Sequence, residues 1–152
     1  MKISNTDLDL IKAALAEDLA GGEDITSVAT IDASATAKAD FTARMSGVIA
    51  GIEIAEAVLR EVGLTETTKV KNDGDHVNAG DVLLSVSGNT RAILLAERTA
   101  LNFFSHLSGV ATLTSTWVKE ISGTKCQVRD TRKTTPGMRV LEKYAVLSLI
   151  HI

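Results

Sequence analysis

The sequence has few of the residues that stabilise secreted or membrane-spanning proteins. Its 152 residues include one cysteine, Cys126, and one proline, and aromatic residues make up 3%. A single cysteine cannot form an internal disulfide and suits a reducing compartment; its apolar, β-favouring surroundings predict a small core residue. Neither a run of eighteen apolar residues nor a basic-then-apolar start is present. We therefore expect a soluble, cytoplasmic protein.

The chain also has no large excess of either positive or negative charge. The chain has 16 basic and 19 acidic side chains, a net charge of −3, which argues against a nucleic-acid or membrane-surface partner. The balance reverses between residues 128 and 143, where five cations face two anions: Arg129, Arg132, Lys133, Arg139 and Lys143 against Asp130 and Glu142. A small anion could bind there, although a solvated basic helix face would have the same composition.

The 45% apolar content is enough for one core, and its spacing predicts the elements around it. Apolar residues at steps of three and four predict helices, and short β-favouring runs between glycines predict strands. The longest helix is apolar almost all round, so we expect it to be buried. The predicted helices cover residues 7–19, 54–62, 91–118 and 135–146, the predicted strands cover 46–51 and 125–129, and residues 71–88 are expected to form antiparallel β-structure.

Arg98 stands out because the helical pattern places its guanidinium on an apolar flank of the longest helix. A charge in that position needs a partner. One explanation is an internal ion pair with Glu97 or another carboxylate. The other is an anion held at a subunit interface or in a cleft.

Residues 130–137, with the sequence Asp-Thr-Arg-Lys-Thr-Thr-Pro-Gly, lie between a predicted strand and a predicted helix. The carboxyl ends of strands carry the catalytic groups of α/β barrels, and a helix start adds backbone donors for anions. This arrangement predicts an anion site. By contrast, His76 and His106 lack a second ligand at metal-site spacing, and the carboxylates of residues 17–24 suit helix-end and turn positions, so we predict no metal site.

Five segments together resemble the quinolinate phosphoribosyltransferase family, in the family's order and over residues 17–146. The resemblance implies an α+β fold, with an N-terminal α/β sandwich containing an antiparallel sheet (residues 1–115) and the first strand and helix of an incomplete α/β barrel (residues 116–146). The segments are residues 17–26 (EDL with GEDIT), 43–52 (ARMSGVIAGI), 73–81 (DGDHVNAGD), 97–112 (ERTALNFFSHLSGVAT) and 130–146 (DTRKTTPGMRVLEKYAV).

The resemblance implies a pentosyltransferase of NAD biosynthesis. Quinolinate and phosphoribosyl pyrophosphate would give nicotinate mononucleotide, pyrophosphate and carbon dioxide, with Mg²⁺ on the pyrophosphate, in a homodimer. Arg132 and Lys133 would bind the two carboxylates, Thr131 or Thr134 would add a neutral donor, and Lys133 would also be catalytic. Arg98 would reach the site from the partner subunit.

The end of the sequence departs from the family pattern. An Arg-Cys-Gly-Gly-Gly-like stretch, an Asn-His-Arg motif, a later lysine and the acidic residues that engage ribose and metal are expected after residue 146 but are absent. We therefore expect an inactive fragment. Residues 147–152 resemble a translated transposon mosaic-end adapter and are interpreted as a non-native tail, so His151 is not taken as a catalytic histidine.

Three other functions remain open. A molybdenum-locus or nicotinate-using phosphoribosyltransferase would share the architecture but act on another base. A biotinyl or lipoyl carrier would share the turns of residues 73–81, although Lys69 and Lys71 lack the setting of a modified lysine. The isolated chain could also be a non-enzymatic fragment that dimerises through its sandwich.

Overall fold

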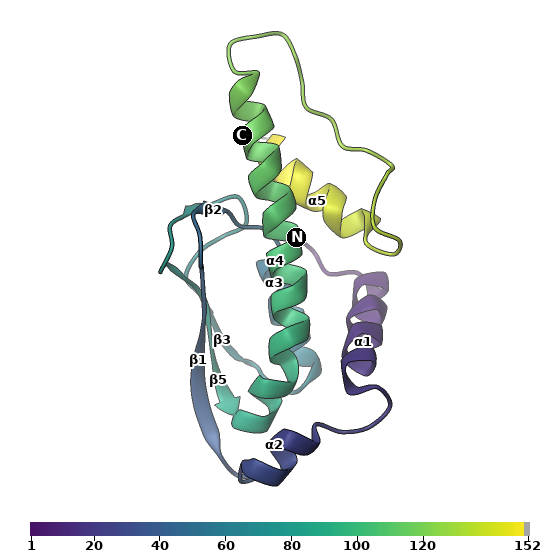
Figure 1. Ribbon diagram of the computed structural model, residues 1–152, viewed down its shortest axis with the longest axis vertical. Coiled ribbons are helices and arrows are strands. Elements are labelled where there is room, and N and C mark those ends of the chain that lie inside the picture. Colours follow the sequence, from purple (N-terminus) through teal and green to yellow (C-terminus); the bar gives the residue numbers. More distant parts are fainter. Residues whose placement is uncertain (151–152) are drawn as a thin grey trace.

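A computed structural model describes residues 1–150 of the chain, with side chains through residue 148. Figure 1 shows the long helix α4 running through the molecule, with strands on one side of it and α1 on the other. The predicted α+β class with an antiparallel sheet is confirmed. The elements are α1 (Asn5–Leu19), α2 (Ile25–Thr30), β1 (Thr36–Thr42), β2 (Gly47–Val48), α3 (Ile52–Glu61), β3 (Glu66–Lys69), β4 (His76–Val77), β5 (Val82–Asn89), α4 (Thr90–Glu120) and α5 (Arg139–Ile150).

The larger sheet has three antiparallel strands in the order β1-β5-β3, and β2 pairs with β4 in a second small sheet. Side chains alternate across β5, so that Leu84 and Val86 are buried while Ser85 bonds to the carboxylate of Asp40 at 2.6 Å on the other face. The antiparallel structure predicted for residues 71–88 is confirmed, but its strands pair with remote segments.

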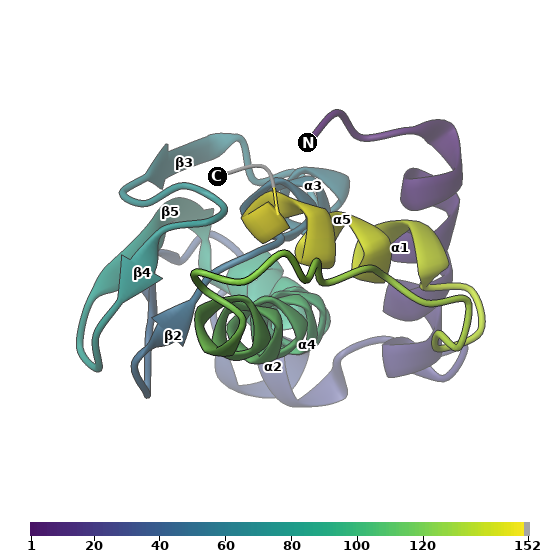
Figure 2. The ribbon, with the colours of Figure 1, turned by 90° about the horizontal axis from the view of Figure 1, so that it is seen from above.

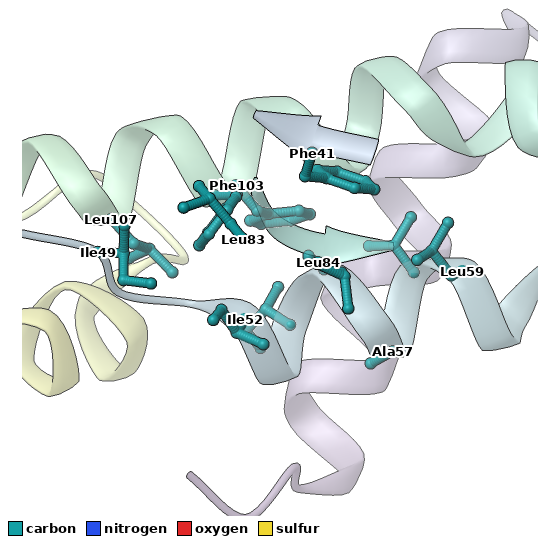
Figure 3. Close-up of a cluster of buried hydrophobic side chains, with 14 of the residues drawn as sticks. Phe41, Ile49, Ile52, Ala57, Leu59, Leu83, Leu84, Phe103 and Leu107 are labelled. Atoms are coloured by element: carbon teal, nitrogen blue, oxygen red, sulfur yellow. The ribbon is translucent and has the colours of Figure 1, made fainter. Parts of the chain in front are cut away.

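The core lies where α3 and α4 cover the three-stranded sheet. Figure 3 shows Phe41, Leu83 and Leu84 of the strands meeting apolar side chains of α3 and α4. Gly51, which precedes α3, has a φ of +99°, and a Cβ there would stand 2.7 Å from Cδ1 of Leu107. Glycine is therefore required at this position by both backbone conformation and close packing.

Side chains of α4 also replace a missing strand beside β2. The backbone N–H of Val48 donates to the Thr112 hydroxyl at 2.9 Å, and that of Ala50 donates to the Ser108 hydroxyl at 3.2 Å. The same two hydroxyls lie within hydrogen-bond distance of the carbonyl oxygens of Val48 and Ala50. These contacts satisfy backbone groups that no described strand reaches, and they fix α4 against the small sheet.

Two helix predictions need correction at their ends. The first helix begins at Asn5 rather than residue 7, with Ser4 as its cap in a capping box with Asp7. The last helix begins at Arg139 rather than residue 135, because Gly137 has a left-handed φ of +82° and ends a turn there. The short elements α2 and β3 and the strand β1 were not among the predicted elements.

Three further predictions were wrong. Residues 125–129 form no strand, because no described strand lies beside them to pair with, and Cys126 is exposed rather than buried. Helix α4 is not buried all round, since the side chains of Leu113 and Trp117 are about 60% exposed. The sheet and the other helices cover only part of the apolar surface of this helix.

The proposed non-native tail of residues 147–152 lies partly outside the described residues; helix α5 runs through its first four positions. The division into sandwich and barrel segments stays a prediction. Among residues 1–150, none of the helices combines the length and the apolarity needed to cross a bilayer.

Candidate anion-binding site

The predicted anion loop, residues 130–137, lies in the irregular segment that connects α4 to α5 (Figure 1). The side chains of Thr131, Arg132 and Lys133 are exposed, and that of Thr134 is partly buried. Within the described residues, neither Arg132 nor Lys133 has a carboxylate at ion-pair distance. The loop therefore presents two adjacent positive charges that are not neutralised by the described part of the chain.

The backbone of the loop is held by the first turns of α5. The guanidinium of Arg139 donates from Nε to the Thr134 hydroxyl at 3.3 Å and from Nη2 to the Arg132 carbonyl at 3.5 Å. The Thr135 N–H donates to Oε2 of Glu142 at 3.2 Å. Within the loop, the Lys133 N–H donates to the Thr131 hydroxyl at 3.1 Å. Four consecutive residues are thus tied to defined partners.

Glu142 connects this loop to α4. Its Oε1 lies 2.8 Å from Nε2 of His106, while its Oε2 accepts the Thr135 N–H. Burial acts to raise the pKa of the Glu142 carboxyl, but the hydrogen bonds from Thr135 and His106 outweigh it and hold the pKa below its ordinary value. The carboxylate is therefore ionised and accepts both bonds at neutral pH.

Arg98 occupies a different place from the one that its sequence pattern predicts. Its side chain is 78% exposed, and its Nη1 lies 3.6 Å from Oδ1 of Asp18. The predicted ion pair with a carboxylate is present, but the partner is Asp18 at the end of α1 rather than Glu97. Leu94 and Leu95 lie beside Arg98 as expected, but the guanidinium is exposed because α4 turns this face toward the acidic residues between α1 and α2.

The structure does not bring Arg98 and the loop cations together within one chain. Arg98 lines a pocket of about 180 Å³ beside Asp24 and α2, and none of the loop residues lines that pocket. The predicted contribution of Arg98 to the site of a partner subunit therefore stays a prediction.

A larger cavity lies directly behind the loop, between α1, α4 and the turn before α5. Its volume is about 410 Å³, and it was not predicted from the sequence. The polar positions of α4 on this cavity recur at steps of three and four, which is the signal that could have revealed it. The lining residues are Ala14, Glu17, Asp18, Thr99, Asn102, Phe103, His106, Thr135 and Met138.

Two histidines, His76 and His106, lie in the described part of the chain and take structural positions. His106 pairs with Glu142, and His76 is an exposed residue of the short strand β4. Within residues 1–150, no group of three or more histidine, cysteine, aspartate or glutamate side chains is placed to hold a metal ion.

Two models of one protein family match consecutive segments of the chain. The family model described as "Quinolinate phosphoribosyl transferase, N-terminal domain" matches residues 24–108, more than half of the chain. The chain belongs to this family. The model of the family's C-terminal domain matches residues 110–148, so the resemblance seen in the sequence is confirmed over both segments.

Individual family members show the same relationship. The chain is 46% identical over 141 residues to the nicotinate-nucleotide pyrophosphorylase (carboxylating) of Mycobacterium leprae and 39% identical to the probable enzyme of that name from Methanothermobacter thermautotrophicus. Both matches cover 91% of this chain but 50% of the relative. The chain thus spans about half the length of the curated relatives it matches.

Solved structures of the family share the fold. NadC from Streptococcus pyogenes is 37% identical and superposes with a TM-score of 0.91 over 97% of this chain and 53% of that chain. The nicotinate-nucleotide pyrophosphorylase of Ehrlichia chaffeensis, 38% identical, superposes with a TM-score of 0.88 over the same shares. Human nicotinic acid phosphoribosyltransferase, at 20% identity and a TM-score of 0.58, shares the fold alone.

Proposed function

We propose that this chain carries the quinolinate-binding loop of a quinolinate phosphoribosyltransferase, which forms nicotinate mononucleotide, pyrophosphate and carbon dioxide from quinolinate and phosphoribosyl pyrophosphate. The supporting observation is the adjacent, exposed and unneutralised pair Arg132 and Lys133 on a loop whose backbone is held by α5. Because the chain spans about half of its relatives, the proposal assigns it this loop and the sandwich rather than a complete catalytic site.

The chemistry of quinolinate fits these side chains. The substrate carries two carboxylates, and a guanidinium beside an ammonium binds two carboxylates through charge-assisted hydrogen bonds. The hydroxyl of Thr131 or Thr134 adds a neutral donor. Lys133 is the proposed catalytic group, because a fixed positive charge beside the substrate stabilises the negative charge left on the ring by decarboxylation.

The remaining components are also proposals. Phosphoribosyl pyrophosphate would arrive with Mg²⁺, which would neutralise the departing pyrophosphate. The described residues do not fit a metal site, so we place its ligands outside this chain and assign no step to it. We further propose a cytoplasmic homodimer in which Arg98, exposed on α4, completes the site of the partner subunit.

Isothermal titration of the purified chain with quinolinate tests the loop assignment. We expect saturable binding that is lost in Arg132→Ala/Lys133→Ala and retained in Lys125→Ala, which removes an exposed cation outside the loop. Nicotinate, which has one carboxylate, should bind about tenfold or more weakly, because one charge-assisted contact is lost.

The same titration discriminates between substrate classes. Nicotinate binding as tight as that of quinolinate would favour a nicotinate-using enzyme. Absence of saturable quinolinate binding, or binding that survives the double substitution, would overturn the assignment of a quinolinate subsite to this loop.

A further inference from the structure

Three charged residues of α5 face the loop that precedes this helix. Arg139, Glu142 and Lys143 stand at positions i, i+3 and i+4, so they share one face of the first turns. From the sequence, Arg139 and Lys143 were assigned to a basic segment that could bind an anion. In the structure, all three side chains contact residues of the preceding loop.

Glu142 and Arg139 each bridge two partners, although Glu142 is largely buried and Arg139 is exposed. The Glu142 side chain is 12% exposed, and each of its oxygens has its own partner, His106 on α4 and the Thr135 N–H in the loop. Arg139 reaches a carbonyl and a hydroxyl of the loop with different nitrogens. Because each side chain has two partners, both its position and its orientation relative to the loop are defined.

The surroundings of the loop make these bridges important. Thr135 and His106 both line the 410 Å³ cavity, so the base of the loop lies over open space instead of a packed core. No described strand pairs with residues 125–129 just before it. Side chains of α5 therefore contact residues 132, 134 and 135 where no sheet ladder holds the segment.

We propose that Glu142 and Arg139 are positioning residues, which fix the backbone of residues 132–135 so that Arg132 and Lys133 project together toward an anionic substrate. Glu142 transmits the position of α4, through His106, to the loop. Holding two cations in one geometry before the ligand arrives lowers the ordering cost of binding. The identity of the ligand rests on the proposed function, but the positioning itself does not.

The third member of this face, Lys143, provides an internal contrast. Its Nζ lies 3.0 Å from Oδ2 of Asp130, but its side chain is 53% exposed. An exposed single ion pair contributes little, so Lys143→Ala should disturb the loop much less than either positioning residue.

Backbone ¹⁵N relaxation of the full chain, without ligand, is the first test. In Glu142→Ala and in Arg139→Ala we expect lower order parameters for the amides of residues 131–135, with the amides of β1 and β5 unchanged. Glu142→Gln keeps the side-chain length and one carbonyl acceptor for the Thr135 N–H, so it should restore most of the order. Lys125→Ala, which also removes an exposed cation, should have no effect.

Quinolinate titration of the same variants is the second test. The dissociation constant should rise about tenfold in Glu142→Ala and Arg139→Ala, because the two cations are no longer preorganised. Glu142→Gln should lie within about threefold of the parent chain, because its side chain can still accept the Thr135 N–H. Circular dichroism identifies any variant that fails to fold; Arg139→Ala, which removes contacts at the surface, then carries the test.

The outcomes separate the two proposals. Loop order that is unchanged in both alanine variants would overturn the positioning role, whatever the binding result. A lower melting temperature with an undisturbed loop would do the same, because it would show a purely structural contact. If the parent chain does not bind quinolinate, the proposed function fails, while the relaxation data still decide whether α5 positions the loop.

Discussion

Residues 1–120 and residues 121–150 are held in place by different kinds of contact. Among the described residues, all buried apolar side chains belong to the first region except Leu141 and Ala145 of α5. Figure 2 shows α5 crossing α4, with the loop before it running along the surface. The first region is a packed core, and the second is a helix docked on it by a narrow apolar contact.

Polar contacts also hold the second region against the first. Tyr144 donates to Oδ2 of Asp73 at 2.6 Å, and Glu142 pairs with His106. A typical hydrogen bond contributes about 0.5–1.5 kcal/mol, whereas burial of one leucine contributes about 1.5–3 kcal/mol. Regions with few buried apolar groups open first, so α5 should separate from the core before the core unfolds.

The largest effect is expected at the centre of the core. Leu84→Ala removes a fully buried side chain of β5 and should lower the free energy of unfolding by about 2–5 kcal/mol. Urea unfolding followed by circular dichroism measures the change. Leu113→Ala, at a 61% exposed position of α4, is the matched control and should cost far less. Equal losses would mean that the sheet is not the centre of stability.

Leu141→Ala tests the docking of α5. Its side chain is 1% exposed, so the substitution should lower the free energy of α5 detachment by about 2–5 kcal/mol. Hydrogen exchange should accelerate at the amides of α5 and stay unchanged in β5. Val140→Ala, next to it but 63% exposed, should leave both rates as they are. Accelerated exchange throughout the chain would show that the two regions unfold as one unit.

Glu56 introduces a pH dependence within the core region. Burial acts to raise the pKa of its carboxyl, but hydrogen bonds from Thr67 and Lys69 and the charges of Lys69 and Arg60 outweigh burial, so the pKa lies below the ordinary 4.5. A carboxyl with a lowered folded-state pKa contributes stability that is complete above its ordinary value and is lost as pH falls through the folded value.

The urea midpoint should therefore decrease as pH falls below 4.5. Glu56→Gln should cost about 1–2 kcal/mol near neutral pH, a modest loss because Lys69 and Arg60 are partly solvated. The variant should also show a shallower decrease toward acid. An identical pH profile in both proteins would assign the acid sensitivity to other carboxylates.

Tyr144→Phe should produce the smallest of these changes. Burial and the bond to Asp73 both raise the pKa of the Tyr144 hydroxyl, so it stays protonated and donates at any working pH. Loss of this bond should cost about 0.5–1.5 kcal/mol of α5 docking, since Asp73 still accepts the Ile52 N–H at 3.0 Å. Hydrogen exchange of α5 amides measures the change, and an increase as large as that of Leu141→Ala would contradict the ranking.

Several elements could be predicted because their information is local. The long helix from Thr90 to Glu120 follows from the spacing of its apolar residues, and the β-favouring runs between glycines predicted antiparallel structure between residues 71 and 88. The strand expected at residues 125–129 failed because a strand requires a partner, and its composition alone could not supply one. The burial predicted for Cys126 was wrong for the same reason, because it assumed that this segment forms a strand.

The order of motifs in the sequence determined the family and the residues of the anion loop, because these depend on which side chains follow one another. Tertiary structure decided which cations remain available to a ligand. Arg132 and Lys133 are exposed, whereas Arg139 contacts the loop backbone and Lys143 pairs with Asp130. Arg98 lies 3.6 Å from Asp18 of another helix, yet its side chain is still 78% exposed. Charge on a side chain is a property of the sequence, but its partner is set by the packing of segments that are distant along the chain.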